Sequence, residues 1–418
     1  MTELRAVEIC AGAGGQSLGL HRAGFRHDLA VELDESAAAT LRHNLTRLQG
    51  EAKVAVGDVA DPAVWNPAEF REVDLLAGGV PCPPFSVAGK QLGSADERDL
   101  FAWAVELAGV VQPRALLLEN VRGLSAPRFS GYRQAVADRL GELGYWSEWR
   151  LLKANEFGVP QLRPRFVLVA VREEFAAHFH WPEPTPTDRT VGSELRDLMA
   201  SRGWRYADKW AEFAAGIAPT IVGGSKKHGG ADLGPTRAKA AWAQLGVDGK
   251  GIANEAPDRN DPSFRTRMPR LTNEMVARLQ GWNGPGFEWE FLGRKTSVYR
   301  QIGNAFPPPV AEAIGRAIAD ALRASVPRRD VAAVTEHDVL YGVLRGASAP
   351  VTHAELVALF PGDLDRRLDA LERDFVLERS GAGSETRYVL GDFKAFRGQD
   401  DHLRHAVFAS KATRSRVS

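Results

Sequence analysis

Cysteine is scarce in this chain, and its scarcity excludes several classes of protein. The 418 residues include two cysteines, Cys10 and Cys82, which are too few for a disulfide framework. No Cys/His pairs have the spacing of a structural zinc site, so no metal is expected. No apolar run approaches the ~20 residues that a membrane span needs, and no signal peptide precedes the first apolar run. We therefore expect a cytoplasmic protein without a membrane anchor.

An excess of charge of either sign is also absent. Lys and Arg number 53, and so do Asp and Glu, which gives a formal net charge of zero. The chain thus lacks the overall basic character of many nucleic-acid-binding proteins, and any such binding depends on local clusters. Three basic pairs are candidates: Lys226-Lys227, Arg163-x-Arg165 and Arg265-x-Arg267. With 44% hydrophobic residues, the chain can bury a sizeable core and has room for two or three domains.

The most informative feature that is present is a cysteine between prolines. Cys82 follows Pro81 and precedes Pro83 and Pro84 in the segment 79–86. Proline restricts φ and removes an N–H. The prolines on both sides of Cys82 would therefore hold its sulfur in one direction, as a catalytic nucleophile requires. The residue by itself is explained equally well as a buried structural cysteine in a proline-rich turn. Other segments decide between the two interpretations.

A glycine-rich turn lies near the N-terminus. An apolar run at 7–11 leads into the glycines of 12–15, and helix-like spacing follows. Such a turn lets the backbone approach a ligand and presents the free N–H groups of a helix N-terminus. Glu32 ends the next apolar run about 20 residues later, where nucleotide-binding folds place the acid that binds ribose hydroxyls, and a third run ends at Asp58. The spacing predicts an adenosine-bearing cofactor, whereas the glycines alone would indicate a structural turn.

A carboxylate and two arginines stand at the ends of further predicted strands. The apolar run 115–118 is typical of a parallel strand buried on both faces, and it ends at Glu119. In the segment 161–166, Arg163 and Arg165 alternate before a strand-like run, so both can lie on one face and bind a phosphate or a carboxylate. The alternatives are a solvated strand end and a solvated edge.

These segments, in their order along the chain, resemble the motifs of the cytosine-C5 DNA methyltransferase family. The resemblance rests on the Pro-Cys loop, the Glu-Asn-Val at 119–121 and the Gln-x-Arg-x-Arg at 161–165. The segments 270–282 and 299–306 are similar to the later motifs of the family. The resemblance extends over residues 7–318 and implies an enzyme of the bacterial type II restriction–modification kind. No single motif is specific for this family, but the order of all the motifs along the chain is specific for it.

The resemblance implies methyl transfer to C5 of cytosine through a covalent adduct. Cytosine C5 does not attack a methyl sulfonium unaided, so the family adds a thiolate to C6, and Cys82 matches that thiolate. Glu119 matches the glutamate that donates near N3. Arg163 and Arg165 match arginines that contact the base region and order the pocket. The base that removes the C5 proton is left unassigned.

The resemblance also implies S-adenosylmethionine as methyl donor and S-adenosylhomocysteine as product. The glycine turn would line the methionine part, Glu32 would bind the ribose and Asp58 the adenine amino group. The family often has Phe at the position of Cys10 and an aromatic residue at that of Leu33, so we expect weaker cofactor binding here. The complete expected cofactor set is Cys10, Ala11, Gly12, Gly14, Gly15, Glu32, Leu33, Asp58, Val59, Pro81, Asn304 and Ala305.

A cytosine inside a duplex has to be flipped out before this chemistry, so a second surface must hold the DNA. The interval 173–284 corresponds to the variable target-recognition region of the family and combines glycines with basic residues. A flexible solvated loop is the alternative for 223–230. The expected DNA contacts are Ser86, Lys226, Lys227 and Arg237.

Strand-like and helix-like segments alternate as far as Val171. This pattern predicts an α/β fold with a doubly wound, mostly parallel sheet and ligands at the carboxyl ends of its strands. The resemblance also implies that the chain leaves this domain for the recognition region and returns with a helix over 309–322 beside the glycine turn, which makes the catalytic domain discontinuous. The expected parts are 1–172 (catalytic), 173–284 (target recognition), 285–328 (return to the catalytic domain), 329–395 (C-terminal module) and 396–418 (flexible tail).

The C-terminal module has a pattern of its own. Three helical segments from 335 to 375 precede a hairpin around 380–384, which predicts a winged-helix-like module. Its role stays open between DNA contact, partner binding and packing.

The resemblance makes double-stranded DNA the expected substrate of a monomeric enzyme in the bacterial cytoplasm. A cognate restriction endonuclease encoded nearby is the expected companion, without a stable complex. One alternative is a tRNA cytosine-C5 methyltransferase, and another is a non-catalytic DNA-binding regulator built on a methyltransferase body. The intact Cys82, Glu119, Arg163 and Arg165 argue against the regulator.

Overall fold

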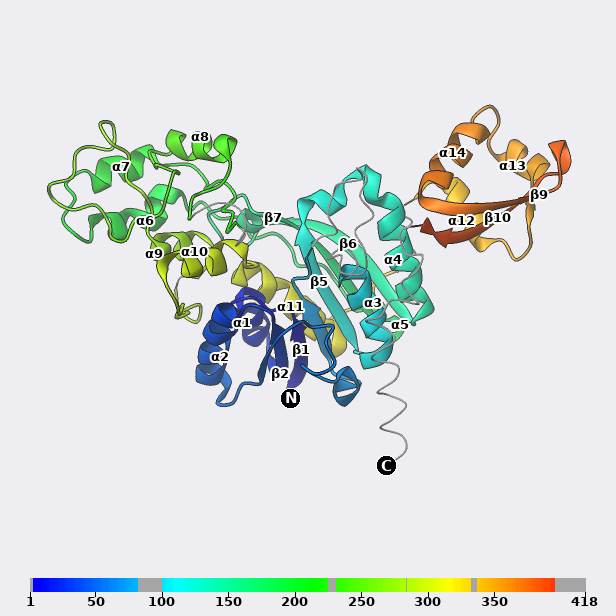
Figure 1. Cartoon of the computed structure of the whole chain (residues 1–418), viewed down its shortest axis with the longest axis horizontal. Helices are drawn as coiled ribbons and strands as arrows, with labels where there is room; N and C mark the ends of the chain where they lie inside the picture. The colour runs from blue at the N-terminus through cyan, green and yellow to red at the C-terminus, as the bar shows by residue number, and fades with distance from the viewer. Residues whose placement is uncertain (1–2, 82–99, 225–230, 283, 332–336, 395–418) are drawn as a thin grey trace.

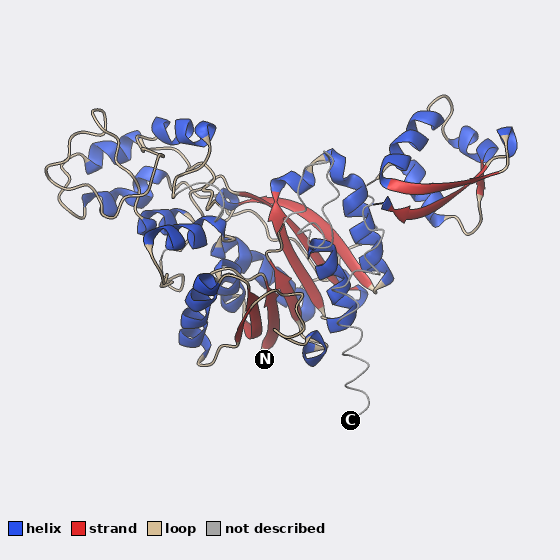
Figure 2. Cartoon of the chain, in the orientation of Figure 1, coloured by secondary structure: helices blue, strands red, loops and turns tan. Residues whose placement is uncertain are grey.

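The structure is a computed structural model, and it describes residues 3–81, 100–224, 231–282, 284–331 and 337–394. Figure 1 shows a central sheet with helices packed around it, a mostly helical region on one side and a small module on the other. The secondary structure of these three parts is distinguished in Figure 2.

The central sheet has seven strands in the order β3-β2-β1-β4-β5-β7-β6. The first five are parallel, and β7 runs antiparallel to both β5 and β6, which confirms the mostly parallel sheet. The strands are β1 (Leu4–Ile9), β2 (Phe25–Glu32), β3 (Val54–Val56), β4 (Leu75–Gly78), β5 (Ala115–Val121), β6 (Tyr145–Lys153) and β7 (Pro164–Arg172). The apolar run that predicts β5 is fully buried at Leu116, Leu117 and Leu118, as a strand covered on both faces requires.

Helices cover both faces of the sheet. On one face, α11 and Leu20 of α1 pack with alternate residues of the strands, such as Ala6 and Leu117. On the other face, α3 and α4 pack with the intervening residues, such as Val7 and Leu116. The helices of this part are α1 (Gly15–Arg22), α2 (Glu35–Gln49), α3 (Leu100–Val111), α4 (Ser130–Glu142), α5 (Glu173–Ala176) and α11 (Pro308–Leu322). Short 3₁₀ turns occur at η1 (Pro67–Phe70), η3 (Arg122–Ser125), η4 (Pro127–Phe129) and η5 (Ala154–Glu156).

The return of α11 beside α1 agrees with the sequence-based expectation, and glycine makes it possible. A Cβ built on Gly19 would lie 2.5 Å from Ala311 Cβ, so only a residue without a side chain lets the two helices approach this closely.

The region between the sheet and α11 is helical, and its core includes the buried tryptophans Trp204, Trp210, Trp242 and Trp282. Its helices are α6 (Val191–Ala200), α7 (Ala207–Phe213), α8 (Thr236–Gln244), α9 (Asn273–Leu279) and α10 (Lys295–Asn304). Tyr299 and Ile302 of α10 belong to the same core, so the packing continues past the expected boundary at residue 284.

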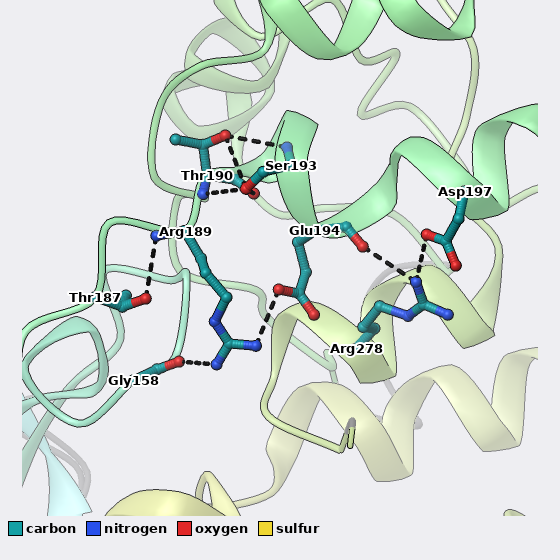
Figure 3. Close-up of polar contacts among 8 residues, drawn as sticks. All are labelled: Gly158, Thr187, Arg189, Thr190, Ser193, Glu194, Asp197 and Arg278. Carbon is teal, nitrogen blue, oxygen red and sulfur yellow. Dashed lines mark hydrogen bonds and ion pairs between the residues drawn. The ribbon is translucent and has the colours of Figure 1, made fainter.

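A hydrogen bond ties this helical region to the end of the sheet, and ion pairs hold α6 within the region (Figure 3). Arg189 donates to the carbonyl of Gly158, in the turn between β6 and β7, and pairs with Glu194 of α6 at 3.1 Å. Arg278 of α9 donates to the Glu194 carbonyl at 3.2 Å and to Asp197 at 2.5 Å. These contacts connect α6 to the central sheet on one side and to α9 on the other.

The C-terminal module has its own core, in which Leu340, Leu356 and Leu371 are fully buried. Its elements are α12 (Val339–Gly346), β8 (Val351–Thr352), α13 (His353–Leu359), α14 (Leu364–Asp374), β9 (Phe375–Ser380), η6 (Gly383–Glu385) and β10 (Arg387–Phe393). The sheet is antiparallel with the order β8-β10-β9. The expected three helices and hairpin are confirmed, and the two-residue strand β8 is an element that the sequence pattern did not predict.

Candidate active site

The glycine turn connects β1 to α1 and adopts left-handed backbone angles. Cys10, Gly12 and Gly14 have φ values of 50°, 59° and 100°. Glycine tolerates this region without strain, whereas Cys10 is an uncommon occupant. Cys10 lies one residue beyond the end of β1 and is half-buried, at the start of the turn. The turn opens at the N-terminus of α1, where helix N–H groups lack intrahelical partners.

Glu32 closes this turn from the neighbouring strand. It is the last residue of β2, and its carboxylate accepts hydrogen bonds from Gly12 N–H at 2.7 Å and Asp34 N–H at 2.8 Å. Burial raises the pKa of Glu32 above that of an ordinary glutamate, although both N–H donors favour the charged form. The next side chain, Leu33, is 71% exposed, which leaves an apolar surface beside the carboxylate.

The third acid follows β3, beside β2 in the sheet. Gly57 N–H donates to the Glu32 carbonyl at 3.0 Å, and Asp58 comes next in the chain. Asp58 accepts a hydrogen bond from Ala60 N–H at 2.9 Å. Val59 is buried, and its carbonyl accepts a hydrogen bond from the Trp65 indole at 2.7 Å. Glu32 and Asp58 therefore stand at adjacent strand ends.

The late motif reaches the glycine turn through Ala305. A Cβ built on Gly15 would lie 3.0 Å from Ala305 Cβ and 3.3 Å from the backbone carbonyl carbon of Phe306, so the late motif packs directly against the turn. Asn304 is exposed, and its side-chain amide donates to the Gly224 carbonyl at 3.3 Å. Of the two expected cofactor residues, Ala305 thus contacts the turn, and Asn304 contacts the segment that precedes 225–230.

Glu119 lies against the segment that leads to the cysteine. It is 9% exposed in β5, and Arg165 of β7 approaches its Oε2 with Nε at 3.3 Å. A Cβ built on Gly79 would lie 3.3 Å from Glu119 Oε1, and Asn120 donates to the Val80 carbonyl at 3.2 Å. Within the described part of the chain, Glu119 Oε2 accepts no hydrogen bond. The end of β5 therefore presents a buried carboxylate beside the start of the Pro-Cys loop.

The Pro-Cys loop itself lies mostly outside the described residues. Pro81 is described and exposed, directly after the buried Val80. Cys82 and Ser86 fall in 82–99, outside the described residues.

Arg163 occupies a different position from Arg165. It is 1% exposed, and its guanidinium donates to three backbone carbonyls: Ile221 at 2.6 Å, Gly303 at 2.9 Å and Ala305 at 2.8 Å. Arg163 therefore joins the start of β7 to the helical region and to the α10–α11 junction.

Two glutamines extend this buried network. Gln161 donates to Gln280 at 2.5 Å and to the Leu279 carbonyl at 3.1 Å. Gln280 donates in turn to the carbonyls of Ile302 and Ala305, each at 3.0 Å. Neither glutamine was among the expected site residues. The available signal was that each lies inside a motif, at 161–165 and 270–282.

The expected DNA contacts are only partly described. Arg237 is exposed on α8, whereas Lys226 and Lys227 lie in 225–230, outside the described residues. In the basic pair Arg265-x-Arg267, Arg267 forms an ion pair with Asp261 at 2.5 Å. The Arg265 guanidinium carbon lies 5.3 Å from the centre of the Phe264 ring.

The described residues hold no group of three or more His, Cys, Asp or Glu side chains that could bind a metal ion. Within the same ranges, no helix is both long and apolar enough to cross a membrane.

Comparisons with known proteins identify the class that this fold and site define. The family described as C-5 cytosine-specific DNA methylase matches residues 4–320. The chain belongs to this family, whose members take the methyl group from S-adenosylmethionine, and it is a DNA cytosine-C5 methyltransferase.

Two relatives place it among the type II enzymes of restriction–modification. It is 59% identical to the type II methyltransferase M.NaeI of Lentzea aerocolonigenes, over 99% of this chain and 100% of the relative. It is 47% identical to the type II methyltransferase M.NgoMIV of Neisseria gonorrhoeae, over 77% of this chain and 99% of the relative.

Solved structures share the fold. A Spodoptera frugiperda DNMT2 mutant superposes with a TM-score of 0.53 and 17% identity, over 76% of this chain and 99% of that chain. An Escherichia coli putative DNA modification methyltransferase encoded within a prophage superposes with a TM-score of 0.52 and 22% identity, over 77% of this chain and 99% of that chain.

Proposed function

We propose that Cys82 and Glu119 perform the covalent step on a cytosine flipped out of duplex DNA. The observation that carries this proposal is the position of Glu119, buried at the end of β5 against Gly79 and Val80, which lead directly to Cys82. The Cys82 thiolate would add to cytosine C6, which makes C5 nucleophilic. Glu119 would supply a proton near N3 as negative charge develops there.

Each arginine has its own part. Arg165 would orient Glu119, because its Nε lies 3.3 Å from Oε2 and the two side chains are largely buried. Arg163 would act as a positioning residue, because it is 1% exposed and its guanidinium donates to three backbone carbonyls. After methyl transfer, loss of the C5 proton releases the thiolate and restores the aromatic ring.

The glycine turn and its neighbours fit S-adenosylmethionine, which supplies an electrophilic methyl group when bound. Glu32 offers carboxylate oxygens for ribose hydroxyls, and its orientation is held by two backbone N–H groups. The exposed Leu33 offers an apolar contact for the adenine, and Asp58 an acceptor for its amino group. The free N–H groups at the start of α1 suit the methionine carboxylate.

The remaining features of the proposal follow from the family. The enzyme would act as a monomer in the bacterial cytoplasm, without a metal ion, on DNA that a companion restriction endonuclease recognises. Arg237, Ser86, Lys226 and Lys227 would contact that DNA. The family match over residues 4–320 favours DNA over tRNA as substrate and catalysis over a purely regulatory role.

Expression in a host that lacks cytosine methylation, followed by bisulfite sequencing of its genome, tests the proposal. We expect one short recurring motif with a methylated cytosine. Cys82→Ala should abolish methylation while DNA binding in gel-shift assays persists, with circular dichroism confirming that the variant is folded. Methylation that survives Cys82→Ala would contradict the covalent mechanism.

A further inference from the structure

A segment of the chain crosses from the helical region back over α2. Residues 286–294, here called the strap, lie between α9 and α10 in sequence. Asn44 of α2 accepts a hydrogen bond from Glu290 N–H at 3.0 Å and donates to the Glu290 carbonyl at 2.7 Å. Thr40 accepts a hydrogen bond from Leu292 N–H at 3.0 Å. Side chains of α2 thus bind the strap backbone much as a neighbouring strand would.

Both ends of the strap are also fixed. Gln301 of α10 donates to the Leu292 carbonyl at 3.0 Å. At the other end, the Arg22 guanidinium of α1 lies 4.0 Å from the centre of the Phe287 ring. Any side chain at the middle of the strap is therefore presented from a rigid support.

The side chain at the middle is Trp289, and it contacts the glycine turn. Its indole N–H donates to the Ala13 carbonyl at 2.8 Å. The ring occupies the space that a Cβ on Gly14 would need, and Leu41 lies 2.8 Å from the same point. Gly14 is thus enclosed between two side chains, and its φ of 100° is a conformation that glycine alone adopts readily.

Trp289 also belongs to two cores. It packs against the cluster beneath α2 that includes Ala11 and Leu41, and against the core of the helical region that holds Trp210. Trp289 therefore contacts the glycine turn directly, whereas Trp210 lies in the helical region and has no hydrogen bond to the turn within the described part of the chain.

We propose that Trp289 is a positioning residue for the cofactor, holding the turn 12–15 in the form that receives the methionine part of S-adenosylmethionine. This inference rests on the proposed function of that turn. Because glycines give the turn many accessible conformations, a hydrogen bond to Ala13 and a ring against Gly14 reduce the ordering that binding would otherwise require. Trp289 acts on cofactor affinity and has no part in the covalent step.

The test is Trp289→Phe, which keeps an aromatic ring and removes the indole donor. We expect the dissociation constant of S-adenosylhomocysteine, measured by calorimetry, to rise about 3- to 10-fold, the size of one lost hydrogen bond. The KM for S-adenosylmethionine should rise in parallel. The KM for DNA and kcat at saturating cofactor should stay close to those of the parent enzyme.

A matched control is Trp210→Phe. It removes an indole hydrogen bond of 3.1 Å to the Gly246 carbonyl, also in the core of the helical region. This variant should lose stability in urea without a change in S-adenosylhomocysteine affinity. If both variants raise the dissociation constant of S-adenosylhomocysteine equally, Trp289 has only a structural role and the proposal is wrong. Should Trp289→Phe fail to fold, Trp289→Tyr is measured instead, with the same expected result.

Glu32→Gln separates this inference from the proposed function. If Glu32→Gln leaves cofactor binding unchanged, the assignment of the cofactor site itself fails. If Glu32→Gln weakens binding and the Trp289 variant does not, the cofactor site stands and the positioning role of Trp289 is refuted.

Discussion

Among single residues, Glu119 combines burial with a neighbouring charge at the point where the chemistry is proposed. Its side chain is 12% exposed, and the Arg165 side chain beside it is 11% exposed. A carboxylate in such surroundings costs free energy unless it is paired, so the arginine stabilises it in the resting enzyme. In the proposed step Glu119 has to take up a proton as the pocket closes around the substrate, and this proton is then donated near N3.

Glu119→Gln should lower kcat by a factor of about 100 or more, because an amide cannot transfer a proton to the base. Binding of S-adenosylhomocysteine should not change. Single-turnover transfer of a labelled methyl group to duplex DNA measures the first quantity, and calorimetry the second. Glu148→Gln, which alters a carboxylate on β6 that pairs with Arg329 at 3.7 Å, serves as control and should retain activity.

Glu32 should make cofactor binding depend on pH. Burial raises its pKa, so the group takes up a proton at a higher pH than an ordinary glutamate does. The ribose requires the charged form as acceptor, so affinity for S-adenosylhomocysteine is full well above that pKa and falls as the pH is lowered through it. Calorimetry between neutral pH and pH 5 should show this decline, and Glu32→Gln should bind more weakly with little dependence on pH. A parent enzyme without the decline would contradict the role of Glu32.

At the scale of secondary-structure elements, Arg163 is the link that holds β7, the helical region and the α10–α11 junction together. A guanidinium can donate to three carbonyls at once because its N–H groups form a rigid planar fork. Gln161 and Gln280 satisfy further backbone groups at the same junction.

Arg163→Lys should destabilise the enzyme by about 2 to 4 kcal/mol, because an ammonium cannot reach all three carbonyls and leaves buried acceptors unsatisfied. Urea denaturation measures the change. Arg196→Lys is the control: Arg196 is 61% exposed and pairs with Asp208, so its replacement should cost less than about 1 kcal/mol. Equal losses for the two variants would show that Arg163 does not link these elements.

Elements with strong local patterns were predictable. The buried run of β5, the three helices of the C-terminal module and the hairpin β9–β10 all appear where the sequence pattern predicts them, and α11 appears where the family resemblance implies it. Strand β8 was missed because two residues carry no periodicity, and it exists only because β10 lies beside it. Cys10 continues the apolar run of β1, yet it begins the turn, because the glycines after it set the backbone.

At the scale of the whole molecule, the C-terminal module docks on α4. Arg345 pairs with Glu142 at 3.0 Å, Tyr341 contacts Asp138, and the Phe393 ring lies 6.2 Å from that of Tyr132. The family match ends at residue 320.

A chain truncated after residue 331 should therefore keep methyl transfer to duplex DNA. It should lose about 1 to 3 kcal/mol of stability, because the polar and aromatic contacts to α4 disappear. Labelled methyl transfer and thermal denaturation of the two proteins measure these effects. A truncated protein that is folded yet inactive would show that the module takes part in catalysis.

The sequence by itself determined the fold class and, through its resemblance to the cytosine-C5 DNA methyltransferases, the reaction class, because the resemblance depends on residue types in a characteristic order along the chain. Only the tertiary structure decided which distant groups meet. Gln161 binds Gln280 across 119 positions, and Trp289 reaches Ala13 across 276. Such contacts arise from the packing of whole elements, so the spacing of residues within one segment does not predict them. The sequence therefore predicted the glycine turn, whereas only the tertiary structure showed that Trp289 packs against it.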